Sequence, residues 1–226
     1  MLSKPVCDHC VDNFPVAEVC CPRCALPLKD TLSELCASCL KSEPPFTCCL
    51  AAYVYDFPVD RLIRNIKYSH RLELVAPLVT PLVEVLTDHY QQQWPDRMIP
   101  VPLHPKKLRQ RGYNQALLIA KAIAKQLPEG IHCPVDYRMV KRHRHTDAQQ
   151  GLSVKGRRKN IKGAFVTEHA LYSQHPQQYR HVALVDDVVT TGETAKEVSR
   201  VLQKQGVEQV DVWCLARTPA APFNFV

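Results

Sequence analysis

The feature of this sequence that most restricts its fold is a short apolar run that ends in two acids and a small polar turn. Residues 182–194 read VALVDDVVTTGET, and a segment with the apolar spacing of an amphipathic helix follows at 193–205. A continuous aliphatic run of this kind is typical of a strand buried on both faces of a parallel sheet. Because such sheets bind ligands beyond the carboxyl ends of their strands, we expect Asp186 and Asp187 at the ligand-binding edge.

The rest of the chain continues this alternation of strands and helices. We expect strands at 50–57, 97–103, 180–187 and 208–216, and helices at 114–127 and 193–205. Residues 59–94 predict helical pieces interrupted by Pro77 and Pro81. Pro100 and Pro102 indicate that their strand lies near a sheet edge. This order predicts the α/β class, with a mostly parallel sheet flanked by helices on both faces.

The turn after the two acids has the chemistry of a phosphate site. Its backbone N–H groups precede a helix, Gly192 permits close approach of a ligand, and Thr190, Thr191 and Thr194 supply hydroxyls. Two adjacent carboxylates suit neighbouring hydroxyls of a sugar that carries the phosphate. A well-capped helix start is the alternative, since TTGE and TAKE fit the capping-box pattern. Capping does not explain the paired acids, so the sequence favours a ribose-phosphate site.

Positive charge is concentrated in one block of the chain. Residues 104–162 carry 15 Lys and Arg against 3 Asp and Glu, whereas residues 1–60 carry 4 against 8. This asymmetry favours a polyanionic partner, and the alternative is a solvated face that keeps the protein in solution.

The start of this block, HPKKLRQRGYNQ, predicts a basic loop between a strand and a helix. Its candidates for contacting pyrophosphate or DNA are Lys106, Lys107, Arg109, Arg111, Gly112 and Asn114. Asn114 is expected to cap the following helix. Gly112 is expected where something approaches the backbone closely.

The end of the block, residues 140–165, is basic, contains glycines and has few apolar anchors. We expect a mobile loop there that returns to a strand at KGAFV. Such a loop suits closure over a pyrophosphate site, and it equally suits a nucleic-acid backbone. Composition does not separate the two.

Nine of the eleven cysteines fall in the first 49 residues, three times as C-x2-C pairs. Two such pairs provide a tetrahedral Zn–S4 site, and a disulfide framework is disfavoured because nothing suggests export. The candidate ligands are Cys7, Cys10, Cys21, Cys24, Cys36 and Cys39. One zinc needs four sulfurs, and we favour the pairs 21/24 and 36/39. The pair 7/10 is then a substitute or part of a second, incomplete site that Cys20, Cys48 or Cys49 completes. Cys133 and Cys214 are expected to be core residues.

Two domains follow from this distribution, a zinc-binding module at 1–50 and a larger domain at 51–226. No apolar run approaches the length of a membrane span, and the first ten residues, MLSKPVCDHC, lack the apolar core of a signal peptide. We therefore expect a cytoplasmic protein without membrane insertion.

The stretch VALVDDVVTTGET resembles, at every position, the 5-phosphoribosyl-1-pyrophosphate (PRPP) motif of the type I phosphoribosyltransferases. The resemblance implies that the loop amides hold the 5′-phosphate and that the two acids contact the ribose hydroxyls. It implies Mg²⁺ held mainly by pyrophosphate and sugar oxygens. The implied PRPP-binding residues are Asp186, Asp187, Val188, Thr190, Thr191, Gly192, Glu193 and Thr194, and the implied catalytic residues are the two acids.

The whole chain resembles a narrower family, the ComF/GntX group of phosphoribosyltransferase-like proteins linked to natural competence. The resemblance is carried by the C-x2-C pairs, IPVPL, RGYNQ, VDDVVTTG, T-x2-Q and R-x2-N-x3-AF. The last two motifs supply the mobile-loop candidates Thr146, Gln149 and Arg157. Lys67 falls where the family usually has LKF, Tyr113 replaces a commoner phenylalanine, and longer members carry four cysteine pairs instead of three.

The family resemblance implies a protein that handles imported single-stranded DNA together with DNA-uptake or recombination proteins. The leading hypothesis is therefore a competence-associated protein that binds PRPP and single-stranded DNA. The alternative is an active phosphoribosyltransferase of nucleotide metabolism, whose base-reading residues the sequence does not identify. A purely zinc-organised scaffold is a third hypothesis.

Overall fold

The computed structural model describes residues 5–17, 19–28, 35–91, 93–144, 156, 160–174 and 176–220. Within these residues, four parallel strands form the main sheet in the order β1-β6-β5-β2. Their bounds are β1 Cys49–Val54, β6 Gln209–Arg217, β5 His181–Val189 and β2 Arg97–Pro100. A separate antiparallel pair joins β3 (Val140–Arg142) to β4 (Phe165–Thr167).

Two short described helices precede β1, and the other described helices lie between the strands in the chain. They are α1 Asp8–Asp12, α2 Ala37–Lys41, α3 Val59–Tyr68, α4 Val75–Tyr90, α5 Pro105–Arg111, α6 Gln115–Gln126, α8 His169–Gln174 and α9 Glu193–Gln205, with 3-10 turns at Leu72–Leu74 and Pro176–Tyr179.

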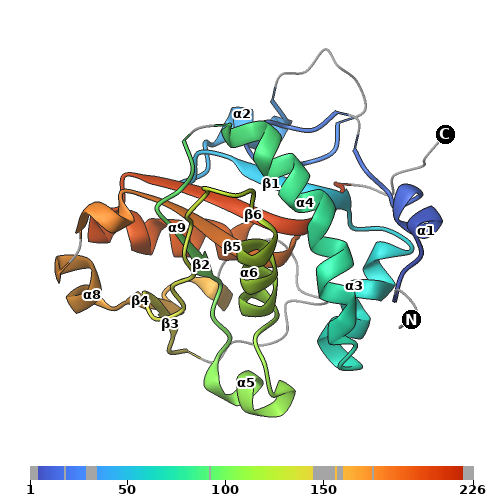
Figure 1. The fold of residues 1–226 in the computed structure, drawn as a ribbon. Helices are drawn as coiled ribbons and strands as arrows, with labels where there is room; N and C mark the ends of the chain where they lie inside the picture. Colours follow the sequence, from blue (N-terminus) through green and yellow to red (C-terminus); the bar gives the residue numbers. More distant parts are fainter. Residues whose placement is uncertain are drawn as a thin grey trace.

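Helices cover both faces of the sheet, as the sequence predicts. Side chains alternate across β5 because successive residues of a strand point to opposite faces. Ala183 and Val185 pack in the core that α4 and α6 share, whereas Val182 and Leu184 pack in the core that includes α9. Figure 1 shows α4 and α6 beside each other on one side of the sheet and α9 on the other. The α/β class with a mostly parallel sheet is confirmed.

Two predictions about element boundaries are wrong. Pro77 and Pro81 do not interrupt the helix, because α4 runs continuously through both. Pro77 lies in the first turn, where no N–H needs an intrahelical acceptor. Leu78 and Leu82 are fully buried around Pro81, and this packing offsets its missing hydrogen bond.

The strand that begins at His181 is longer than expected. It continues past the two acids to Val189, because Val188 and Val189 still pair with β6. Asp186 and Asp187 therefore lie inside the last part of the strand and share its alternation of faces. The predicted edge strand at 97–103 is confirmed as an edge but ends at Pro100.

Candidate functional site

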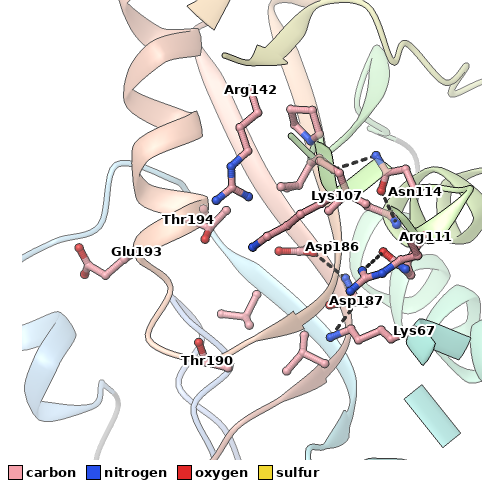
Figure 2. A pocket seen from close by; sticks show the side chains of 18 of the residues that line it. Lys67, Lys107, Arg111, Asn114, Arg142, Asp186, Asp187, Thr190, Glu193 and Thr194 are labelled. Carbon is pink, nitrogen blue, oxygen red and sulfur yellow. Dashed lines mark hydrogen bonds and ion pairs between the residues drawn. The ribbon is translucent and has the colours of Figure 1, made fainter. Parts of the chain in front are cut away.

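A cavity of about 360 Å³ lies at the carboxyl end of β5. Its walls come from α3, α5, the start of α6, β3, the last residues of β5 and the start of α9 (Figure 2). The predicted residues that line it are Lys107, Arg111, Asn114, Asp186, Asp187, Val188, Thr190, Gly192, Glu193 and Thr194. Thr191, Lys106, Arg109 and Gly112 are not among its lining residues. Thr146, Gln149 and Arg157 lie outside the described residues.

The two acids of the cavity have different surroundings. The carboxylate of Asp187 forms an ion pair with Lys67, with 2.9 Å between Oδ2 and Nζ. Burial opposes the charge of Lys67, but the attraction of Asp187 outweighs it and raises the pKa of the lysine.

Asp186 is held closer to neutrality. Burial and the neighbouring charge of Asp187 raise its pKa to about 7, although Lys67 and the backbone N–H of Asp187 act in the other direction. One acid is therefore paired with a lysine, and the other exchanges its proton near neutral pH.

Among the described residues, five cations line the same cavity, namely Arg64, Lys67, Lys107, Arg111 and Arg142. Arg111 is held by its hydrogen bond to Gln115, at 2.7 Å, and by its guanidinium lying 5.2 Å from the centre of the Tyr68 ring. Arg142 enters from β3, where the positive charge acts on Asp186. An excess of fixed cations around two acids suits a ligand that carries both phosphoryl groups and hydroxyls.

Sequence reasoning did not assign three of these cations to the site. Lys67 is only a family match in the sequence, and no motif assigns Arg64 or Arg142 to a site. The four-residue spacing from Ile63 to Lys67 does place Lys67 on the α3 face next to Ile63, which is buried. That spacing gives the direction of the side chain but not the pocket it reaches.

The turn after β5 has the backbone geometry of an anion site. Gly192 has a φ of 74° and is the N-cap of α9. The first N–H to donate along the helix is that of Lys196, to the Gly192 carbonyl at 2.9 Å. The N–H groups of Glu193 and Ala195 precede it and have no intrahelical acceptor. Neither capping box is formed, because the N-cap is glycine.

The side chain of Glu193 does not face an anion. Its carboxylate is mostly buried and pairs with Lys196, with 2.9 Å between Oε1 and Nζ. Only the backbone of Glu193 is suited to contact a phosphate. Thr191 Oγ1 is buried without a hydrogen-bond partner among the described residues.

Of two predictions about the basic segment, the cap at Asn114 is confirmed and the loop before it is wrong. Asn114 caps α6 as expected, since its Oδ1 accepts from the Ala116 N–H at 3.0 Å, while its Nδ2 donates to the Val101 carbonyl. The expected loop is instead the helix α5, begun by His104, whose Nδ1 accepts from the Lys106 N–H. Gly112 ends this helix with a φ of 82°, and a Cβ there would meet no atom within 4 Å. The left-handed backbone accounts for the glycine, and no described protein atom approaches it closely, so close approach of a ligand stays a prediction.

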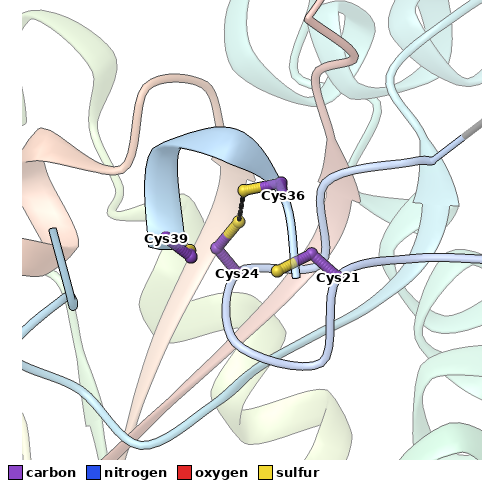
Figure 3. Close-up of side chains that lie close together, drawn as sticks. All are labelled: Cys21, Cys24, Cys36 and Cys39. Atoms are coloured by element: carbon purple, nitrogen blue, oxygen red, sulfur yellow. Dashed lines mark hydrogen bonds between the residues drawn. The ribbon is translucent and has the colours of Figure 1, made fainter. Parts of the chain in front are cut away.

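Four cysteines gather in one cluster, Cys21, Cys24, Cys36 and Cys39, with all sulfurs within 4.8 Å of one another. Figure 3 shows one pair on a turn and the other pair at the start of α2, facing each other, with Cys36 as the N-cap of that helix. The sulfurs of Cys24 and Cys36 are 3.6 Å apart, near the spacing of about 3.8 Å that a tetrahedral Zn–S4 centre gives. Burial acts to raise the pKa of the Cys21 thiol, but hydrogen bonds from the backbone N–H groups of Cys36, Cys24 and Arg23 outweigh it and lower this pKa to about 7. The cluster can hold a metal ion, and its thiolate donors suit Zn²⁺.

The remaining cysteines lie outside this cluster. Cys7 and Cys10 are exposed, with 3.1 Å between their sulfurs, so their role as ligands stays a prediction. Cys133 and Cys214 are buried core residues, as expected.

No described helix combines the length and the apolar character that a membrane span requires.

Comparison with known proteins identifies relatives over nearly the whole chain. Residues 114–224 match the family model of the phosphoribosyl transferase domain. The chain is 37% identical to DNA utilization protein YhgH of Escherichia coli O157:H7 over 94% of this chain and 90% of the relative. It is 37% identical to Competence protein F of Haemophilus influenzae over 93% of this chain and 88% of the relative.

A crystal structure of purine phosphoribosyltransferase from Pyrococcus horikoshii Ot3 aligns with 68% of this chain and 92% of that chain, at 17% identity and a TM-score of 0.33. The family assignment does not depend on this alignment. It rests on the relatives that match over nine-tenths of the sequence, and by that measure the chain belongs to the ComF/GntX family of phosphoribosyltransferase-like proteins.

Proposed function

We propose that this protein is a competence-associated DNA-handling protein that binds PRPP, or a related ribose phosphate, and single-stranded DNA in the cytoplasm. In this proposal it supports DNA uptake together with uptake or recombination proteins. The observation that carries the ligand is one cavity whose described lining combines Asp186, Asp187, Thr190, Gly192, Glu193 and Thr194 with five cations. The names of the relatives, DNA utilization protein and Competence protein F, support the DNA part.

The proposed roles follow from the chemistry of each group. The N–H groups at the start of α9 bind the 5′-phosphate, because they lack intrahelical acceptors and lie at the positive end of the helix dipole. The carboxylates of Asp186 and Asp187 accept hydrogen bonds from the ribose hydroxyls. Lys67, Lys107 and Arg111 bind the pyrophosphate from the opposite wall. Mg²⁺ accompanies the ligand and would neutralise part of its charge.

The proposed DNA-binding surface adjoins the mouth of this cavity. Lys106 and Arg109 are exposed on α5, outside the cavity lining, while Lys107 and Arg111 of the same helix line it. Exposed cations on one short helix suit the backbone of a single strand, which needs no base-specific contacts. We further propose that residues 1–50 form the zinc-binding module and residues 51–226 the phosphoribosyltransferase-like domain.

One observation favours the second candidate, an active phosphoribosyltransferase. Asp186 has a pKa of about 7 and lines the cavity, so it suits proton transfer to or from a reacting group at neutral pH. Release of pyrophosphate from PRPP across a panel of nucleobases tests this candidate. Turnover with one base that is lost in Asp186→Asn would establish it, and its absence with every base leaves the binding function.

The main test separates the two proposed ligands with two matched variants. Calorimetry measures PRPP binding with Mg²⁺, and fluorescence anisotropy measures binding of a labelled single strand over a salt series. Lys106→Ala/Arg109→Ala should lower the salt slope of DNA binding by about 1.4, at roughly 0.7 per lost phosphate contact, and leave PRPP affinity unchanged. Asp186→Ala/Asp187→Ala should weaken PRPP binding. Unaltered DNA binding in the first variant contradicts the DNA surface, and unaltered PRPP binding in the second contradicts the ligand site.

A further inference from the structure

We propose that Arg217 is a positioning residue that joins the four-cysteine cluster to the phosphate turn, so that metal in the cluster and phosphate at the turn strengthen each other's binding. This inference rests on the proposed PRPP site. The inference links the cysteine cluster to the cavity through a residue that belongs neither to the C-x2-C pairs nor to the motif at 182–194.

The side chain of Arg217 contacts both regions at once. It is the last residue of β6 and is only 6% exposed. Its Nε donates to the Cys24 carbonyl at 2.8 Å. Its Nη1 donates to the Val189 carbonyl at 3.0 Å and to the Thr190 carbonyl. One planar guanidinium thus spans from a cysteine of the cluster to the first residues of the turn.

These contacts orient the amides of the turn. In a trans peptide the carbonyl and the following N–H point in opposite directions. Because Arg217 holds the carbonyls of Val189 and Thr190, the N–H groups of Thr190 and Thr191 point away from the guanidinium. The same contacts bring a positive charge behind the turn. The Thr218 N–H also donates to the Val189 carbonyl at 3.0 Å, so loss of Arg217 frees the Thr190–Thr191 peptide, which leads to the N–H groups of α9, and removes a charge that attracts the anion.

The charge of Arg217 also needs compensation. Its acceptors are all backbone carbonyls, and no acidic side chain of the described residues pairs with it. A buried cation with only neutral acceptors is costly. A divalent ion with four thiolates leaves two net negative charges beside Cys24, and these would compensate the guanidinium. Metal loading should therefore hold Arg217, and with it the turn, in the arrangement that binds phosphate.

Coupling of this kind is reciprocal. If metal tightens PRPP binding, then PRPP tightens metal binding by the same factor at equilibrium. We expect a factor on the order of tenfold, within the usual range of coupling between two sites.

The first experiment uses the unmodified full chain. Calorimetry with PRPP and Mg²⁺ compares protein loaded with zinc and protein stripped by a chelator that is then removed, with near-UV circular dichroism to confirm that the sheet domain stays folded. Zinc transfer to a chromophoric chelator is followed with and without PRPP. The proposal expects about tenfold weaker PRPP binding after stripping and slower zinc transfer with PRPP present.

The second experiment uses Arg217→Gln with Arg23→Gln as the matched control. Arg23 lies in the same cysteine turn and donates to the Thr47 carbonyl at 2.9 Å, without contact to the phosphate turn. Arg217→Gln should weaken PRPP binding in the zinc-loaded protein and abolish the effect of PRPP on zinc transfer, whereas Arg23→Gln keeps both. Should Arg217→Gln fail to fold, Arg217→Lys replaces it as a variant that keeps the charge. The measurements on the unmodified chain still test whether zinc and PRPP binding are coupled.

The outcomes separate the inference from the function on which it rests. No PRPP binding by the loaded, unmodified chain overturns the proposed ligand and the inference together. Equal PRPP affinity with and without zinc, at unchanged zinc transfer, overturns the coupling alone. A coupling that persists in folded Arg217→Gln overturns the role of Arg217.

Discussion

The two walls of the cavity differ in how their residues are distributed along the chain, and the sequence predicts only one of them. The turn wall consists of neighbouring residues, from Asp186 to Thr194, on one strand–turn–helix unit. The opposite wall gathers cations from α3, α5 and β3, whose positions span residues 64 to 142. A contiguous motif therefore predicts chemistry directly, whereas a wall built from distant segments requires the tertiary fold.

The largest effect should come from removing the two acids of the turn wall. Asp186→Ala/Asp187→Ala should weaken PRPP binding about 100-fold, because two charge-assisted hydrogen bonds of roughly 1.5 kcal/mol each are lost. Inorganic pyrophosphate lacks ribose hydroxyls, so its affinity should not fall. Calorimetry with both ligands measures the difference. Glu208→Ala, which alters an exposed ion pair with Arg180, is the control. Equal losses for the two ligands would mean that the acids do not read the sugar.

The opposite wall should respond in the reverse pattern. Lys67→Met should weaken PRPP and pyrophosphate alike, by about tenfold each, because one charge-assisted contact to the diphosphate is removed. Competition between the two ligands measures both constants in one titration. Lys121→Met on the exposed surface of α6 is the control. A loss confined to PRPP would place Lys67 with the acids instead of with the cations.

A smaller effect concerns pH. The folded pKa of Asp186 is about 7, above its usual 3.8. The folded protein therefore keeps a proton that the unfolded chain releases between these values, and the free energy of unfolding should fall as pH rises through that interval. PRPP binding, which uses the charged carboxylate, should strengthen several-fold between pH 6 and 8.

Asp186→Asn provides the comparison for this prediction. Thermal unfolding at pH 5 and pH 8 should show the variant gaining stability relative to the unmodified chain as pH rises. Its PRPP affinity should lose the dependence near pH 7. Parallel pH profiles for the two proteins would assign the titration to another group.

The smallest effect tests whether Gly112 serves the backbone or the ligand. Gly112→Ala forces a Cβ into the left-handed region and should cost about 1 kcal/mol of stability. PRPP affinity should stay within about twofold, since a coupling below 0.5 kcal/mol is expected without a contact. Thermal unfolding and calorimetry check the two halves. A large loss of affinity with little loss of stability would restore close approach as the reason for this glycine.

A feature could be predicted from the sequence when the residues that determine it lie close together along the chain. The strands, α6 with its Asn114 cap, the four clustered cysteines and the turn at 190–194 depend on neighbours within a few residues. The prediction failed at Pro81, where packing around α4 outweighs a local preference against helix. It failed again at α5, where a basic composition concealed a helix begun by His104 and ended by Gly112. Arg142 and Arg217 act through contacts 27 residues or more away along the chain, which no local pattern encodes.

The length of β5 sets a geometric condition on any molecule that touches both acids. The side chain of Asp187 lies on the side of Ala183 and Val185, where it pairs with Lys67 of α3, and that of Asp186 lies on the side of Leu184, where Arg142 of β3 acts on it. In the proposed function, a ribose that contacts both carboxylates therefore lies across this edge of the sheet, with α3 on one side and β3 on the other.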